Sequence, residues 1–155
     1  MTIAVATLTS TEILEQARAH GRSQSLAYAG ALGPEEAWQL VERGDAILVD
    51  VRTAEEHKFV GHVPGSYHVA WQTGAALIKN PRFLKELEQK APKTANILLL
   101  CRSAKRSALA AEAAAKAGFA NVFNVLEGFE GDKDDHQQRG IAGGWRLRGL
   151  PWQQD

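Results

Sequence analysis

The sequence predicts an α/β fold in which a parallel sheet is covered by helices. The runs Ala46–Val51 and Asn96–Leu100 are continuously apolar, which is typical of strands that are buried on both faces. Between such runs lie segments with helix-start and helix-stop residues. Strands that alternate with helices favour parallel pairing through right-handed crossovers. The length of 155 residues fits one domain with a short additional arm.

The N-terminal part is predicted to form a helical arm. Residues Thr9–His20 carry apolar side chains at helical spacing, and Ser10 or Thr11 is suited to cap the start. We therefore divide the chain into an arm, residues 1–29, and a main domain, residues 30–155. The pattern leaves open whether the arm packs on the domain, contacts a second copy or moves freely.

The main domain shows a regular alternation of elements. Pro34 suits a first helical turn, and an alanine-rich stretch that ends at a glycine is a strong helix signal. The glycine-broken acidic segment Gly128–His136 is expected to form a short surface helix and loop. In chain order, the other predicted elements are a helix from Pro34 to Gly44, a strand Ala46–Val51, a shorter strand Ser66–Ala70, a helix opened by Asn80 and Pro81, a strand Asn96–Leu100, a helix Ser103–Ala117 and a strand Asn121–Val125.

Composition excludes several classes of protein. Eighteen basic and eighteen acidic residues give no net charge, so we expect neither a nucleic-acid nor a membrane partner. The segment Met1–Leu8 lacks the basic start and long apolar core of a signal peptide, and we expect a cytoplasmic protein. A single cysteine cannot form an internal disulfide or a multi-cysteine zinc site. The scattered histidines lack metal-ligand spacing, so we expect no metal and no other cofactor.

The most informative segment places Cys101 directly after a buried strand and just before a helix. Ligands of open parallel sheets bind at the carboxyl ends of the strands, and a helix start offers free N–H groups to an anion. Arg102, Lys105 and Arg106 add positive charge to this turn, while Ser103 and Ser107 can donate hydrogen bonds. These features favour the thiolate form of the cysteine and hence a nucleophile.

A structural role for Cys101 is the alternative, because cysteine is often simply a small buried residue. Three cations near a helix start are electrostatically unfavourable unless an anion binds there. The cations therefore favour reactive chemistry over simple packing.

Four segments resemble the rhodanese family, and together they cover residues 32–152. No single segment is decisive, but their order and spacing are specific. One residue is added between Arg52 and Gly61 relative to the commonest spacing, and Ala104 stands where many members have glycine. We expect the Ala104 backbone to avoid a positive φ. The matching segments are Asp50-Val51-Arg52 with Glu55, Glu56 and Gly61–Ser66; Cys101–Ser107; Ala108–Gly118 with Asn121–Gly128; and Gly143–Trp145 with Gly149–Pro151.

The resemblance implies a rhodanese-like parallel sheet of about five strands flanked by helices on both faces. It implies that Cys101 carries sulfur as a persulfide and that the following loop binds the donor; that loop consists of Arg102, Ser103, Ala104, Lys105, Arg106 and Ser107. It also places Asp50 and Arg52 near the mouth of the site, although we expect them to be mainly architectural, with Glu55 or Glu56 pairing with Arg52. Trp71 either lines the mouth or packs in the core.

The implied function is that of a sulfurtransferase. Cys101 would take sulfur from a small anionic donor such as thiosulfate and pass it to a thiol, cyanide or a protein acceptor. A persulfide carrier between proteins, or a regulatory module, is an alternative. A cysteine-dependent phosphatase or arsenate reductase is a second one. Phosphatases of related fold place five residues between cysteine and arginine, whereas four separate Cys101 from Arg106, which favours sulfur over phosphate. The oligomeric state, the physiological donor and the acceptor stay open.

Overall fold

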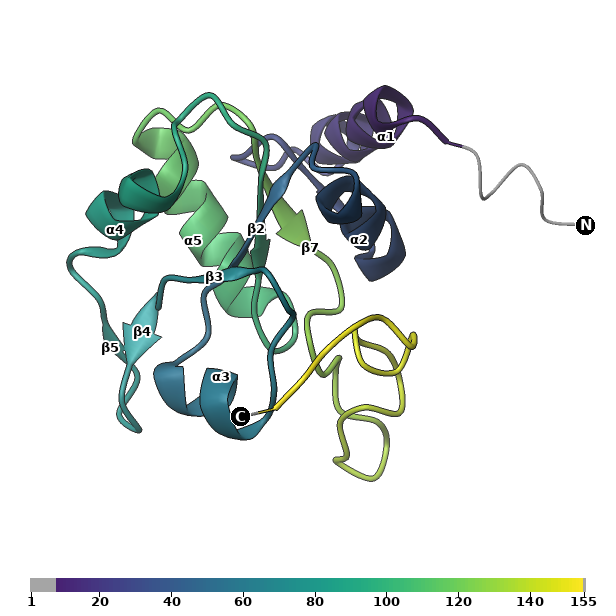
Figure 1. The fold of residues 1–155 in the computed structure, drawn as a ribbon, viewed down its shortest axis with the longest axis vertical. Helices are drawn as coiled ribbons and strands as arrows, with labels where there is room; N and C mark the ends of the chain where they lie inside the picture. Colours follow the sequence, from purple (N-terminus) through teal and green to yellow (C-terminus); the bar gives the residue numbers. More distant parts are fainter. Residues whose placement is uncertain (1–7, 155) are drawn as a thin grey trace, which may run out of the picture.

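A computed structural model describes residues 8–154 and shows a five-stranded parallel sheet between two layers of helices (Figure 1). The predicted α/β class and strand number are confirmed. Residues 1–7, on which most of the signal-peptide prediction depends, lie outside this range. The elements are α1 (Ser10–Ser23), β1 (Gly30–Leu32), α2 (Pro34–Glu42), β2 (Ile47–Asp50), α3 (Ala54–Phe59), β3 (Tyr67–His68), β4 (Gln72–Thr73), β5 (Ile78–Lys79), α4 (Phe83–Lys90), β6 (Ile97–Leu100), α5 (Lys105–Lys116) and β7 (Val122–Val125).

The sheet has the order β1-β7-β6-β2-β3, and every neighbouring pair is parallel. The central strand β6 is buried along its whole length, as its apolar sequence predicts. Asp50 at the end of β2 pairs in register with Leu100 at the end of β6. The carboxyl ends of these two strands therefore meet at one edge of the sheet. The segments that begin at Asp50 and at Cys101 both leave the sheet at this edge.

Alternate residues of the central strands feed two separate cores. Ile97 and Leu99 pack with α4 and α5 on one face, while Leu98 and Leu100 pack with α1 and α2 on the other. Figure 1 shows the same division, with α4 and α5 on one side of the sheet and α1 and α2 on the opposite side. The two-residue period of a strand thus explains why continuous apolar runs occur here.

Helix α1 packs against β1 and joins the core on one face of the sheet. Ile13 and Ala17 are buried. A Cβ added to Gly30 would lie 2.1 Å from the Ala17 carbonyl oxygen, so β1 lies too close to α1 for any residue other than glycine at this position. The predicted cap was wrong. Thr9 caps α1, because its hydroxyl accepts from the Glu12 N–H at 3.1 Å while the Glu12 carboxylate accepts from the Thr9 N–H at 2.9 Å.

Several short elements were not predicted. They are β1, α3 and the β4–β5 hairpin, each of six residues or fewer and therefore without a clear period. The segment Gly128–His136 contains turns and no helix, contrary to the prediction. Helix α4 begins at Phe83 rather than at Asn80, because the Asn80 side chain accepts a hydrogen bond from the Arg82 N–H instead.

The C-terminal segment returns across the domain. Trp145 is completely buried, and Trp152 covers Gly61. Backbone hydrogen bonds of 2.8 and 2.9 Å join His62 and Gln153. Within residues 8–154, no helix is long and apolar enough to span a bilayer.

Candidate active site

Cys101 lies at the junction between β6 and α5, where the sequence placed it. Its side chain is 1% exposed, and the Ser107 hydroxyl donates a hydrogen bond to Sγ at 3.2 Å. Helix α5 begins at Lys105, so its first turn supplies N–H groups without helical partners on the side of the cysteine loop. The thiol is therefore held at the positive end of a helix and has one hydroxyl donor beside it.

The Ser107 hydroxyl has two possible acceptors but only one proton. It also contacts Oδ1 of Asn124, whose own amide donates to the Ala104 carbonyl at 3.1 Å. A thiolate at Cys101 is the stronger acceptor of the two, whereas a neutral thiol leaves the proton to Asn124. Sequence reasoning missed Asn124, which is a polar residue inside the otherwise apolar strand β7.

Ala104 adopts the conformation that we expected it to avoid. Its φ is 74°, in the left-handed region that favours glycine. The loop must turn sharply here to bring the start of α5 back towards Cys101, and the hydrogen bond from Asn124 holds the Ala104 carbonyl in that turn. The prediction was wrong because the loop geometry, not the side chain, determines the backbone at this position.

The cysteine loop is braced from outside by the segment that follows β7. Phe129 N–H donates to the Cys101 carbonyl at 2.8 Å, and the N–H groups of Glu130 and Gly131 donate to the Arg102 carbonyl at 3.0 and 3.1 Å. A Cβ on Gly128 would lie 2.5 Å from the Arg102 carbonyl oxygen, so this close approach requires glycine. These backbone hydrogen bonds hold the cysteine loop in place and involve none of the loop's side chains.

A hollow of about 260 Å³ opens over the residues that follow Cys101. Arg102 and Lys105 on its rim are exposed, and neither forms an ion pair with any residue in the described range. Their charges are therefore available to an anion that enters the hollow. The lining residues are Glu56, Gln72, Leu77, Arg102, Ser103, Lys105 and Arg106.

Arg106 is bound by Glu56 rather than being free. Its two terminal nitrogens donate to the Glu56 carboxylate at 2.7 and 2.8 Å, and both side chains are mostly buried. Burial opposes ionisation of Glu56, but the hydrogen bonds and charge of Arg106 outweigh it and lower the pKa to about 2. The expectation that Glu55 or Glu56 pairs with Arg52 is therefore wrong.

Arg52 pairs instead with Asp50, and both side chains are completely buried. The Arg52 guanidinium donates to Asp50 at 2.6 Å and to the Gly61 carbonyl at 2.6 Å, and it lies 4.3 Å from the centroid of the Phe129 ring. Its Nη1 has no hydrogen-bond partner within residues 8–154. Neither residue lines the hollow over the cysteine loop.

Trp71 belongs to the core and to a second hollow. It is 6% exposed and meets Phe83 edge to face, with the ring centroids 5.1 Å apart. The second hollow, of about 300 Å³, is lined by Trp71, Lys79, Asn80, Pro81, Phe83, Leu84 and Ala113. Trp71 therefore does not line the hollow over the loop, although it borders the neighbouring one.

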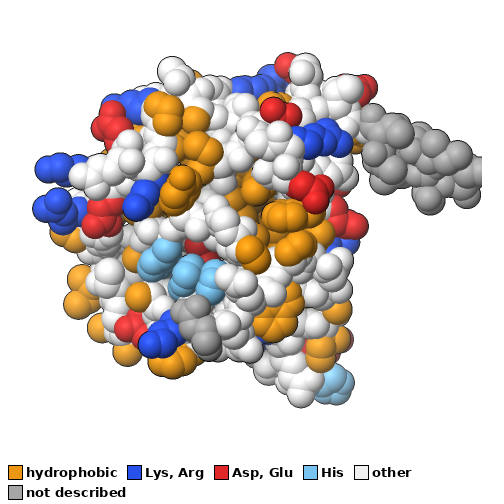
Figure 2. Space-filling model, viewed as in Figure 1, with side chains coloured by type: hydrophobic (Ala, Val, Ile, Leu, Met, Phe, Trp, Pro, Cys, Tyr) orange, Lys and Arg blue, Asp and Glu red, His pale blue; other side chains and the backbone are white. Residues whose placement is uncertain are grey.

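The rings of three histidines, His57, His62 and His68, lie close together, and Figure 2 shows histidine side chains gathered on one face of the molecule. The His57 ring stacks on His62 at 4.2 Å between centroids and lies 4.8 Å from His68. Burial lowers the pKa of His57; the Asp50 charge opposes this effect, and the neighbouring imidazoles add to it. Across the described part of the chain, no group of three such side chains is arranged to hold a metal ion.

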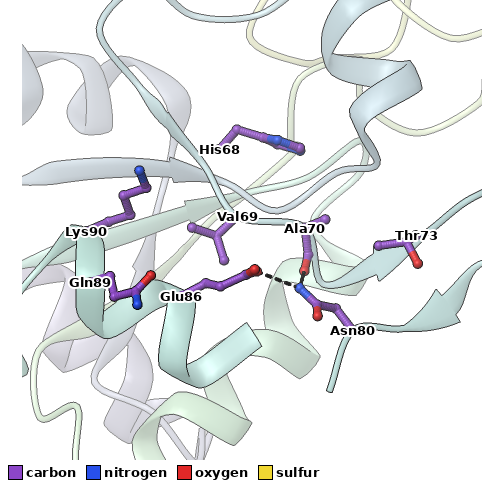
Figure 3. A pocket seen from close by; sticks show the side chains of 8 residues that line it. All are labelled: His68, Val69, Ala70, Thr73, Asn80, Glu86, Gln89 and Lys90. Atoms are coloured by element: carbon purple, nitrogen blue, oxygen red, sulfur yellow. Dashed lines mark hydrogen bonds between the residues drawn. The ribbon is translucent and has the colours of Figure 1, made fainter. Parts of the chain in front are cut away.

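A wider hollow of about 450 Å³ lies between the end of β3 and α4 (Figure 3). Figure 3 shows Glu86 joined to the Asn80 amide, a hydrogen bond of 2.8 Å that crosses its floor. No residue of the cysteine loop lines it. We therefore take the smaller hollow over the loop as the candidate active site.

The fold and site together define a class: a parallel α/β protein with a buried cysteine in a cationic strand-to-helix loop. Comparison with known families identifies the class more closely. The family model named "Rhodanese-like domain" matches residues 33–135. This chain therefore belongs to the rhodanese-like domain family, which confirms the predicted family. The matched range includes the first three of the four segments and ends before the fourth.

Individual proteins are also similar to this chain. An uncharacterized protein of Rickettsia prowazekii, RP600, is 38% identical over 118 residues, which are 74% of this chain and 88% of the relative. A thiosulfate sulfurtransferase, GlpE of Actinobacillus pleuropneumoniae serotype 5b, is 25% identical over 77% of this chain and 89% of its own. The crystal structure of Rv0390 from M. tuberculosis is similar with a TM-score of 0.74 and 42% identity, covering 83% of this chain and 99% of that one.

Proposed function

We propose that this protein is a sulfurtransferase that carries sulfane sulfur on Cys101. One observation carries the proposal: a buried thiol with a hydroxyl donor at 3.2 Å comes directly before the loop that lines a hollow, and the rim of this hollow carries Arg102 and Lys105, two cations without an ion pair among residues 8–154. This arrangement suits an anionic donor that must approach an anionic nucleophile. The cycle also needs a reduced thiol, so we expect a reducing compartment such as the cytoplasm.

The loading step uses thiosulfate as the donor. The Cys101 thiolate attacks the outer sulfur, a new S–S bond forms, and the original S–S bond breaks with its electron pair going to sulfite. Cys101 then carries a persulfide anion, and the total charge is unchanged. Arg102 and Lys105 would stabilise the dianionic donor and the departing sulfite. The name of the GlpE relative supports thiosulfate as a donor.

The loop would then hold the persulfide. Its outer sulfur carries negative charge, and the N–H groups at the start of α5 with the Ser107 hydroxyl are donors for that charge. The 1% exposure of Cys101 keeps water away from the reactive sulfur. In the discharge step a nucleophile such as cyanide or a thiol attacks the outer sulfur, and Cys101 leaves as a thiolate.

Phosphate transfer is less well supported by the same loop. A cysteine-dependent phosphatase needs the loop arginine to bind phosphate in a bidentate manner. Here both terminal nitrogens of Arg106 are bound by Glu56 at 2.7 and 2.8 Å, and the loop has four rather than five intervening residues. These observations favour sulfur as the transferred group.

Steady-state kinetics test this proposal. Thiosulfate and cyanide are varied together, and thiocyanate is measured. A persulfide intermediate predicts ping-pong kinetics, with parallel lines in the double-reciprocal plot. Intersecting lines would contradict the covalent cycle. Efficient loading with very slow discharge to cyanide would support instead a relay that gives its sulfur to a protein.

A further inference from the structure

The hollow over the cysteine loop and the hollow at Trp71 are both lined by residues of the β4–β5 hairpin and of α5. The hollow over the loop includes Leu77 of the hairpin and Lys105 of α5. The hollow at Trp71 includes Lys79 of the same hairpin and Ala113 of the same helix. Both therefore lie between the β4–β5 hairpin and α5, one after the other along the helix.

Helical spacing places a third α5 residue between these hollows. Lys105, Leu109 and Ala113 follow one another at four-residue intervals and share one face of the helix. Leu109 is 56% exposed although it is apolar. Between Lys105 and Ala113 the helix rises about 12 Å, and we call the surface that runs from the hollow over the loop past Leu109 to the hollow at Trp71 the groove.

The two ends of this groove differ chemically. The end at the cysteine loop carries the charges of Arg102 and Lys105, which form no ion pair within the part of the chain that the structure describes. The far end is lined mainly by apolar side chains around Trp71, and the Lys79 ammonium lies 4.8 Å from the centroid of the Trp71 ring. A small inorganic donor would occupy only the charged end at the cysteine loop, because it has no apolar group to bind at the Trp71 end.

We propose that the groove binds an extended, acidic segment of a partner protein whose cysteine accepts sulfur from Cys101. An extended chain rises about 3.3 Å per residue, so a groove of about 12 Å spans three to four residues. The partner's cysteine lies at the loop, and an apolar side chain about four positions away enters the hollow at Trp71. Acidic residues near the cysteine meet Arg102 and Lys105, and those near the apolar side chain meet Lys79. This proposal rests on the proposed sulfurtransferase function and names its acceptor.

The transfer step is balanced without another reactant. The partner's thiol loses its proton and attacks the outer sulfur of the Cys101 persulfide, and a new S–S bond forms on the partner. The bond between Sγ of Cys101 and the outer sulfur breaks, and its electron pair stays on Cys101. The released proton accompanies the resulting Cys101 thiolate, and the partner leaves as a persulfide.

Two isomeric peptides test the groove. In the first, phenylalanines lie four positions to either side of a central cysteine, with glutamates between them. In the second, the same residues are rearranged so that both phenylalanines adjoin the cysteine. We expect the spaced peptide to discharge the loaded protein at least tenfold faster than its isomer, whichever direction the chain takes. Equal rates for the two isomers would overturn the proposal.

A charge placed in the groove supplies a matched variant. Leu109→Asp removes an apolar contact and repels the glutamates, so the rate with the spaced peptide, relative to cyanide, should fall about tenfold. Leu147 is similarly exposed, at 50%, but lies in the C-terminal segment, and Leu147→Asp should leave that ratio unchanged. If the rate with the spaced peptide relative to cyanide is unchanged in Leu109→Asp, or falls equally in both variants, the claim that the groove binds the peptide is contradicted.

Direct binding separates this proposal from the sulfur chemistry. Fluorescein-labelled forms of both peptides, with serine in place of cysteine, are titrated with the unloaded protein and followed by fluorescence anisotropy. The groove predicts at least tenfold tighter binding of the spaced peptide, and equal binding overturns it. If Cys101 fails to load with sulfur, the sulfurtransferase proposal fails, and the anisotropy result still decides whether the groove selects this spacing.

Discussion

The ends of β2 and β6 lie side by side at one edge of the sheet, yet they use their charges in opposite ways. Asp50 ends β2 and Arg52 follows it, and the two are fully buried and paired with each other. Arg102 and Lys105 follow β6, and they are exposed and unpaired within residues 8–154. A charge whose partners are all internal stabilises the fold, whereas a charge left at the rim of a hollow is available to a ligand.

Arg106 and Glu56 connect these two regions. Glu56 follows β2 on α3, and its carboxylate binds Arg106 at the start of α5. The pair thus ties the structural loop to the reactive loop, and it takes one of the three loop cations away from the ligand. The comparison separates residues whose loss should change stability from residues whose loss should change turnover.

Replacement of the nucleophile should have the largest effect. Cys101→Ser keeps the size of the side chain but removes the sulfur that forms the persulfide. Thiocyanate production should fall by at least about 10³-fold, while the unfolding midpoint in urea changes little. Activity that survives in this variant would mean that the sulfur is carried elsewhere.

The structural loop should respond in stability. Arg52→Ala leaves Asp50 as an unpaired buried charge, which destabilises a protein by about 3–5 kcal/mol. Arg148, which pairs with Glu127 at the surface, is the control, and Arg148→Ala should lower the free energy of unfolding by no more than about 1 kcal/mol. Urea unfolding measures the free energy of unfolding of both variants. Equal decreases in the two variants would contradict the distinction between buried and exposed ion pairs.

The reactive loop should respond in turnover. The double variant Arg102→Gln/Lys105→Gln should lower kcat/KM for thiosulfate roughly tenfold, because the dianionic donor loses two attracting charges. The loss should shrink as salt is added, since ions screen exposed charges. Lys116→Gln, at the other end of α5, is the control for net charge. An unchanged kcat/KM in the double variant would refute the role of the rim cations.

The connecting pair should give a pH-dependent stability. The pKa of Glu56 is about 2 in the folded protein against 4.5 for an ordinary glutamate, so its contribution is complete above pH 4.5 and is lost as the pH falls towards 2. After solvent screening we expect about 1–2 kcal/mol. The stability difference between the wild type and Glu56→Gln should therefore decrease over that range, and a constant difference would count against the pair.

The smallest expected effect concerns Ala104. Its φ of 74° is unfavourable for any residue with a Cβ, so Ala104→Gly should stabilise the protein by about 0.5–1 kcal/mol. Thermal unfolding of the two proteins measures this difference. A destabilised glycine variant would show that the loop is not strained at this position.

The sequence predicted the parts of the fold that have a long, regular pattern. The buried strand β6, the alanine-rich helix α5 and the position of Cys101 between them followed from apolar runs and helix signals. The strand β1 and helix α3 were missed because three or six residues carry no clear period. A Thr53-x-x-Glu56 capping box was present in the sequence and could have revealed α3.

The details of the candidate site depended on contacts that no local pattern encodes. Arg106 pairs with Glu56 across fifty residues, and Ser107 of helix α5 donates to Asn124 of strand β7. Arg52 took the partner two residues before it, because its guanidinium is buried under Phe129 rather than directed towards α3. Charge and spacing predicted which residues are near the cysteine, but packing decided which of them are paired.

One measurement tests the central claim most directly: the intact mass of the reduced protein before and after incubation with thiosulfate, with Cys101→Ser measured in parallel. The account predicts a gain of one sulfur atom that disappears when cyanide is added and is absent from the variant. No gain with thiosulfate or with a persulfide donor, or an equal gain in the variant, would contradict a persulfide on Cys101.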